Sequence, residues 1–190
     1  MVHIQILRHT KSTSHILLKN QRGETMNNSN LFNLERILRR PPDAWAVIEG
    51  SDMYPEITGS VKFYNTALGV FVTAEVQNLP RSDIRCESPI LAFHIHEQGN
   101  CSGNAGDPFA NVGMHYNPYD CPHPYHAGDM PPLFSTNGYA FSAFLTDRFT
   151  LDEIIGRAVI IHSSPDDFTT QPSGNAGTKI ACGNIMGRRR

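Results

Sequence analysis

Leu91-Ala92-Phe93-His94-Ile95-His96 is a short apolar run that is interrupted by two histidines. The run predicts a β-strand, in which successive side chains alternate between the two faces. His94 and His96 therefore project from the same face, close to each other. A sheet presents two imidazoles to one ion in this way, so the run predicts both β-structure and a candidate metal site.

Six more segments after residue 43 predict strands separated by turn residues. In residues 70–76, aliphatic residues at the even positions alternate with Phe71, Thr73 and Glu75 on the other side. Residues 150–155 predict one helical turn at most. We therefore expect an all-β sandwich or barrel. Its predicted strands cover residues 45–49, 61–64, 70–76, 91–96, 139–145, 158–162 and 180–186.

A long irregular segment, residues 98–133, separates two of these strands. Such a loop inside a compact domain is uncommon and is usually functional. It holds His115, His123, His126 and Asp129, and three nitrogens with one oxygen fit tetrahedral zinc. The histidines that remain lie on predicted strands and supply three imidazoles suited to copper or zinc: His94, His96 and His162.

Structural roles compete with metal binding for these histidines. A lone histidine is more often a hydrogen-bonded structural residue or a surface residue, and one His-x-His pair arises by chance. However, all six histidines after residue 41 fall in the two sets, together with an acid. Their number and grouping favour metal binding.

Charge is distributed unevenly along the chain. Of the sixteen Lys/Arg, seven lie in residues 1–40 and three in residues 188–190, which leaves six in residues 41–187. That central region holds sixteen of the eighteen acids. Its acidity argues against a nucleic-acid partner. We expect the three C-terminal arginines to form a solvated basic tail.

Residues 1–40 predict a basic N-terminal extension ahead of a domain over residues 41–187. Residues 1–28 lack sustained periodicity, which predicts disorder. Leucines and an isoleucine recur at helical spacing in residues 29–40 and predict a short amphipathic helix that ends at Pro41. Its apolar face would pack on the domain or, alternatively, contact a partner.

The N-terminal region also bears on location. Ile16-Leu17-Leu18 is the longest apolar stretch near the start, too short for a signal peptide or a membrane span. At face value we expect a cytoplasmic protein with no membrane partner. If the N-terminus is misannotated, an extracytoplasmic location is the expectation instead. Met26 is an alternative start, although residues 26–41 also contain no signal-like apolar core.

Four motifs contain or flank the candidate metal ligands. They are Phe93-His94-Ile95-His96-Glu97, Gly113-Met114-His115-Tyr116-Asn117-Pro118, His126-Ala127-Gly128-Asp129 and Gly174-Asn175-Ala176-Gly177-Thr178-Lys179-Ile180-Ala181-Cys182-Gly183. They resemble copper/zinc superoxide dismutase, in that family's order and near its spacing. The resemblance covers about residues 44–187, and the stretches 128–131 and 151–162 are more similar to the bacterial branch.

The resemblance implies a Greek-key β-barrel or sandwich of immunoglobulin-like, two-sheet architecture with long metal-binding loops. Asp166 would hydrogen-bond a ligand histidine of each metal, and Cys101 would form a disulfide with Cys182. His115 would bridge the two metals. The implied ligands are His94, His96, His115 and His162 for copper, and His115, His123, His126 and Asp129 for zinc.

The resemblance also implies an activity. One superoxide reduces Cu(II) and leaves as dioxygen; the next reoxidises Cu(I), takes two protons and leaves as hydrogen peroxide. His115 would carry a proton between these steps. Lys179 stands where the family usually has an arginine beside copper, so it keeps the charge that attracts superoxide but loses the guanidinium's fork of donors. We therefore expect activity that is slower than that of a fast family member.

Two other functions fit parts of the sequence. A dismutase-like copper/zinc-binding protein with weak or no catalysis would act as a copper carrier or scaffold. A structural β domain with zinc alone would need no complete copper set. A homodimer is compatible with all three functions.

Cys86 and Cys121 match nothing in the family: a second bridge, two buried thiols, or a thiol near the zinc loop all remain open, with thiols favoured.

Overall fold

The computed structural model describes residues 18–19, 25–26, 33–84 and 89–188. Residues Pro42–Asn65 and Gly69–Arg190 form one compact unit. Its main sheet runs in the order β7-β10-β11-β3-β4-β5-β9, with β12 paired to β3. The strands are β3 (Ala44–Gly50), β4 (Thr58–Thr66), β5 (Gly69–Gln77), β7 (Phe93–His96), β9 (Ala140–Thr146), β10 (Ala158–His162), β11 (Lys179–Asn184) and β12 (Met186–Gly187).

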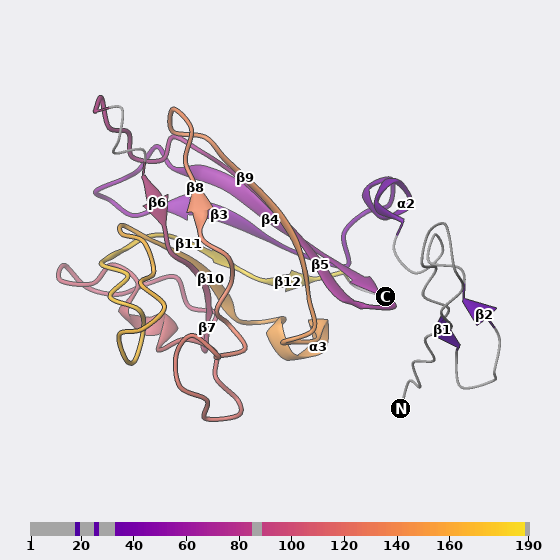
Figure 1. Cartoon of the computed structure of the whole chain (residues 1–190). Helices are drawn as coiled ribbons and strands as arrows, with labels where there is room; N and C mark the ends of the chain where they lie inside the picture. The colour runs from indigo at the N-terminus through magenta and orange to yellow at the C-terminus, as the bar shows by residue number, and fades with distance from the viewer. Residues whose placement is uncertain (1–17, 20–24, 27–32, 85–88, 189–190) are drawn as a thin grey trace, which may run out of the picture. The chain divides into compact units, whose positions relative to one another are not determined.

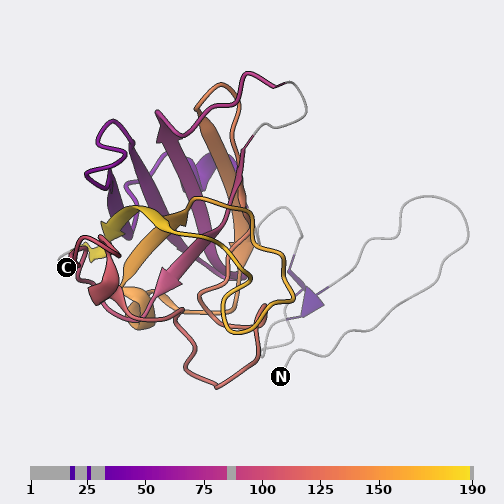
Figure 2. The same ribbon diagram turned by 90° about the vertical axis from the view of Figure 1, so that its left-hand side faces the viewer.

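The main sheet is antiparallel and curls on itself (Figures 1 and 2). β5 pairs with β9 rather than with the next strand in the chain, which gives the crossover of a Greek key. A separate two-stranded ladder joins β6 (Ile90–Leu91) to β8 (Leu133–Phe134). The expected all-β Greek-key architecture is confirmed.

The core forms from one face of each strand. On β5 the side chains of Val70, Val72, Ala74 and Val76 are buried, while Glu75 faces solvent, as the alternation predicted. Phe71 departs from the pattern because it too is buried, with its ring 6.2 Å from that of Tyr64. On β7 all four residues are buried, so both of its faces are covered.

Differences from the expected elements are small. Two predicted strands are each split, residues 91–96 into β6 and β7 and residues 180–186 into β11 and β12. β8 was missed because two residues carry no periodicity. The single helical turn is confirmed as α3 (Leu151–Ile154), whose N-terminus is capped where Thr150 N–H donates to Glu153 Oε2 at 2.7 Å.

The N-terminal unit contains helix α2 (Leu34–Leu38), capped where Asn33 Oδ1 accepts the Arg36 N–H at 2.9 Å. The helix is shorter than predicted, and residues 29–32 lie outside the described ranges. A two-residue ladder pairs β1 (Leu18–Lys19) with β2 (Thr25–Met26). The predicted disorder of the rest of residues 1–28 also falls outside them. Among the described residues, no helix is long and apolar enough to cross a membrane.

Candidate metal centre

The site is built on the sheet face opposite the main core. In the β7–β10 register, His94 pairs with Ile160 and His96 with Ala158. Phe93 and Ile95 point the other way, into the core. The β10–β11 register shifts between Ile161 and His162, a bulge-like irregularity at the end of the strand.

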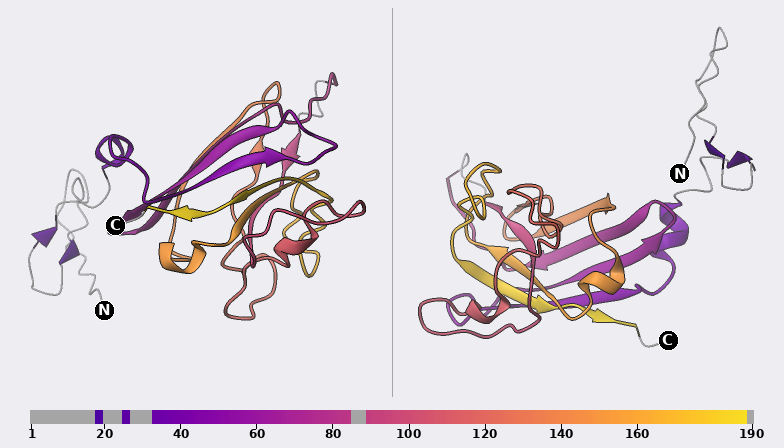
Figure 3. Two further views of the ribbon diagram at one scale, coloured as in Figure 1. Left: turned by 180° about the vertical axis from the view of Figure 1, so that it is seen from behind. Right: turned by 90° about the horizontal axis from the view of Figure 1, so that it is seen from below.

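The long loop after β7 folds back along that strand. Tyr116 N–H donates to Ile95 O at 2.8 Å, and Ile95 N–H donates to Gly128 O at 2.9 Å. The approach is so close that a Cβ on Gly128 would lie 2.3 Å from Ile95 O, so glycine is required there. These bonds place His115 opposite His96 and Asp129 opposite His94. This loop and residues 163–178 gather beside β7 and β10 (Figure 3).

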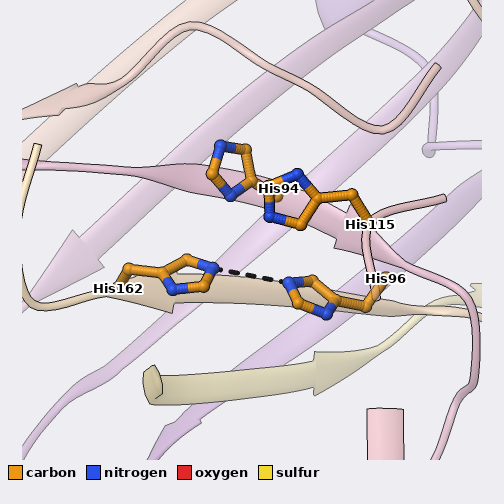
Figure 4. Close-up of side chains that lie close together, drawn as sticks. All are labelled: His94, His96, His115 and His162. Carbon is orange, nitrogen blue, oxygen red and sulfur yellow. Dashed lines mark hydrogen bonds between the residues drawn. The ribbon is translucent and has the colours of Figure 1, made fainter. Parts of the chain in front are cut away.

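The first cluster consists of four buried histidines from two strands and the loop. Each offers a ring nitrogen, and these nitrogens all lie within 4.8 Å of one another. Figure 4 shows the rings gathered with nitrogens turned toward a shared space, and His96 Nε2 lies 3.4 Å from His162 Nε2. The cluster comprises His94, His96, His115 and His162.

Each imidazole has an inner nitrogen, which points into the cluster, and an outer nitrogen, which points away from it. Hydrogen bonds of the outer nitrogens orient the rings of His94 and His96. His96 Nδ1 lies 2.9 Å from Gly113 O, and His94 Nε2 lies 2.8 Å from Asp166 Oδ2. Each outer nitrogen donates its proton to an oxygen, which leaves the inner nitrogen unprotonated. Two inner nitrogens, His94 Nδ1 and His115 Nε2, are buried without a hydrogen-bond partner. Buried polar atoms are rarely left in this way, and here they fit a metal ion.

The second cluster uses the other nitrogen of His115. Its Nδ1 lies 2.8 Å from Asp129 Oδ1 and 3.4 Å from His126 Nδ1. His123 Nδ1 lies 3.0 Å from Asp129 Oδ2, but without hydrogen-bond geometry. Three imidazoles and a carboxylate within 4.8 Å fit the tetrahedral donor set of zinc. His115 therefore presents one nitrogen to each cluster.

Asp166 links the two clusters through hydrogen bonds to one histidine of each. Its Oδ2 binds His94 Nε2 and its Oδ1 binds His123 Nε2, both at 2.8 Å. The chain passes so close that a Cβ on Gly174 would lie 2.1 Å from Asp166 Oδ1. Burial alone would raise the pKa of Asp166, but hydrogen bonds from His94, the Phe168 N–H and His123 outweigh it and hold the pKa well below its usual range. The carboxylate therefore stays ionised and keeps both rings oriented.

Burial favours the neutral form of four of the clustered histidines. It lowers the pKa of His162 to about 3, with the neighbouring His94 and His115 adding to the effect. The pKa of His96 is lowered well below its usual value for the same reasons, burial first. Burial also lowers the pKa of His94 and of His126. Neutral imidazole is the form that binds metal, so the site is prepared to accept ions near neutral pH.

Acid should destabilise the metal-free protein. Because the folded-state pKa values of His96 and His162 are lowered, their contribution to stability is complete above the unfolded pKa of about 6.5. This contribution to stability is lost progressively as the pH falls below the unfolded pKa toward the folded-state pKa, which is about 3 for His162. Between pH 6.5 and 5 we expect a loss of up to about 2 kcal/mol per histidine. Urea midpoints at pH 7.5, 6.5 and 5 measure it; a midpoint that does not move between pH 6.5 and 5 contradicts this.

The sequence did not reveal some residues that hold the second cluster. Gln171 clamps the backbone of His123: its Oε1 accepts the N–H at 3.0 Å and its Nε2 donates to the carbonyl at 2.8 Å. Arg148 Nη1 donates to Pro124 O at 3.0 Å. The sequence could not predict either contact, because each side chain bonds to a backbone group more than twenty residues away along the chain.

Removal of the Gln171 clamp should loosen the second cluster selectively. We expect Gln171→Ala to weaken zinc binding about tenfold, because supporting partners orient ligands, while copper binding stays unchanged. Competition with a zinc chelator measures the affinity. Gln77→Ala, an exposed glutamine on β5, is the control. Equal zinc affinity in the two variants would show that the clamp has no part in metal binding.

The structure describes three of the four cysteines. Cys101 and Cys182 form a disulfide, as the resemblance implied. Cys121 carries a free, half-buried thiol, so it forms no second bridge. Cys86 lies outside the described residues.

Lys179 lies on the wall of a cavity of about 310 Å³ that reaches the first cluster. His96, His115 and His162 line the same cavity. The Lys179 ammonium forms an ion pair with the Asp107 carboxylate, and its side chain is 16% exposed. The sequence placed Lys179 near the first cluster but did not single out Asp107.

The fold and the two ligand sets define a β-barrel protein with adjoining candidate metal sites that share one histidine. The model of the family "Copper/zinc superoxide dismutase (SODC)" matches residues 57–185. The copper-zinc superoxide dismutase of Legionella pneumophila is 36% identical over 152 residues, covering 75% of this chain and 86% of that protein. Copper-zinc superoxide dismutase 2 of Aquifex aeolicus is 34% identical over 145 residues, covering 68% and 80%.

A solved structure agrees with these relatives. The crystal structure of a SOD-like protein from Bacillus subtilis matches with a TM-score of 0.60 at 26% identity, covering 73% of this chain and 95% of that one. This chain belongs to the copper/zinc superoxide dismutase family. The family resemblance of the sequence motifs is confirmed.

Proposed function

We propose that this protein is a superoxide dismutase that binds copper and zinc. Copper is held by the first cluster, His94, His96, His115 and His162. Zinc is held by the second, His115, His123, His126 and Asp129. The observation that carries the proposal is the pair of complete donor sets around His115, whose Nε2 is buried without a partner while its Nδ1 meets Asp129.

Each group in the site has a part in the chemistry. When bound, copper supplies the exchange of one electron with each superoxide. His115 lines the cavity, and its Nε2, which has no hydrogen-bond partner, would be the atom that holds and releases a proton. Asp166 keeps His94 and His123 in the required tautomer. The cavity admits a small anion to the first cluster.

A dismutase-like protein that binds metal without turnover is the second candidate. One observation favours it: the positive charge of Lys179, which would attract superoxide, is paired with Asp107. The Bacillus subtilis protein of similar structure is also described as SOD-like. All seven ligand positions carry a residue that can bind metal, which favours the enzyme. A carrier would need neither a shared histidine nor a second donor set.

Metal analysis and a superoxide assay on the same sample test the proposal. We expect about one copper and one zinc per chain after loading, and superoxide consumption that is lost on copper removal. Full metal content with no superoxide consumption would support the carrier or scaffold. Failure to bind copper would contradict both.

The disulfide bears on location. Disulfides persist mainly in oxidising compartments, and Cys101–Cys182 ties the cavity loop to β11. This supports function outside the cytoplasm rather than the cytoplasmic location that the N-terminal sequence suggested.

A further inference from the structure

The cavity that leads to the first cluster is lined by one acidic and one basic side chain. Besides histidines, Asp107 and Lys179 are the only charged residues among those that line it. They form an ion pair with each other. The two formal charges therefore cancel at the approach to the cluster.

The Asp107 carboxylate is fixed by its own loop. Its Oδ1 accepts the Phe109 N–H at 3.1 Å, and its backbone N–H donates to Asn104 Oδ1 at 3.1 Å. Its carbonyl accepts the Ala110 N–H at 3.2 Å. With Oδ1 and the backbone engaged, Oδ2 is left to meet Lys179.

The disulfide holds the partners together. Cys101 opens the segment that carries Asp107, and Cys182 follows Lys179 on β11. The covalent link joins the segment that carries Asp107 to the strand that carries Lys179. Phe109 and Cys182 pack in the same buried cluster, which leaves the loop little freedom to carry Asp107 away.

We propose that Asp107 is a specificity-determining residue that sets the anion affinity of the cavity by neutralising Lys179. The inference rests on the proposed function, because it concerns the approach of superoxide to the copper cluster. With Asp107 in place, the pair adds no net charge to the approach. Without it, Lys179 alone would draw monoanions toward His96 and His162.

The first test needs no metal. Lysine acylation followed by mass spectrometry measures the labelling rate of Lys179 in the parent and in Asp107→Asn, a variant that keeps an oxygen to accept the Phe109 N–H. We expect Lys179 to be labelled at least about threefold faster in the variant, since the charged partner is gone. Equal labelling rates would overturn the inference even if the protein is an active dismutase.

The second test uses azide, a small monoanion, on copper- and zinc-loaded protein, with binding followed by absorbance. Asp107→Asn should bind azide about threefold more tightly at low ionic strength, and the gain should shrink in high salt. Lys179→Ala should bind it about threefold more weakly. The double variant restores a balanced cavity and should return to within about twofold of the parent.

Glu56→Gln, an exposed acid outside the cavity, makes the same change in net charge and is the control. If Asp107→Asn and Glu56→Gln change azide affinity equally, the inference is wrong. Superoxide rate constants for the same variants should follow azide affinity at low ionic strength. If azide affinity follows the charge balance but superoxide is not consumed, the inference stands and the proposed enzymatic function fails.

Discussion

Replacement of His115 by alanine should weaken copper and zinc binding together and reduce superoxide consumption to background. His115 is the one residue that belongs to both donor sets, with Nδ1 beside Asp129 and Nε2 buried without a partner. Loss of a ligand exceeds the cost of losing a supporting hydrogen bond, so each affinity should fall at least about 100-fold. Chelator competition for each metal, with an assay on the same sample, measures the effect.

His126→Ala is the matched control. His126 belongs to the second cluster alone, so its variant should lose zinc and keep copper. The comparison separates a shared ligand from general damage to the loop. If His115→Ala loses only one metal, the two sites do not share that residue and the account of the centre is wrong.

Replacement of Asp166 by alanine should weaken both sites without removing a ligand. Its two carboxylate oxygens orient His94 in one cluster and His123 in the other, and the side chain is buried. Outer partners of this kind are worth about 10–100-fold in metal affinity. We expect a loss in that range for copper and for zinc, measured by chelator competition.

The neighbouring acid provides the control for this prediction. Asp167 is exposed and bonds to the Thr169 and Thr170 groups instead of a histidine. Asp167→Asn should keep both affinities. If Asp166→Ala and Asp167→Asn behave alike, Asp166 does not couple the clusters.

The strands were predictable where periodicity was long. β5 follows the alternation of residues 70–76, and β10 matches its predicted bounds. The split between β6 and β7 could not be foreseen, because Ala92 continues the apolar run while its N–H donates to Ser164 O, outside the ladder. Tertiary hydrogen bonds override local pattern at such points.

The candidate ligands were predictable because histidine is scarce and chemically distinctive. The structure brings all seven predicted ligands into two clusters. Asp166 came from the family resemblance, since on spacing alone it is a loop acid beside Asp167. Asp107 and Gln171 had no signal, because their partners lie 72 and 48 residues away.

In the proposed centre, two metals lie on opposite nitrogens of His115. Anomalous difference maps at the copper and zinc edges, from crystals of protein loaded with both metals, test this arrangement. We expect a copper peak among His94, His96, His115 and His162, and a zinc peak among His115, His123, His126 and Asp129. A single peak, or two peaks of which only one contacts His115, would contradict it.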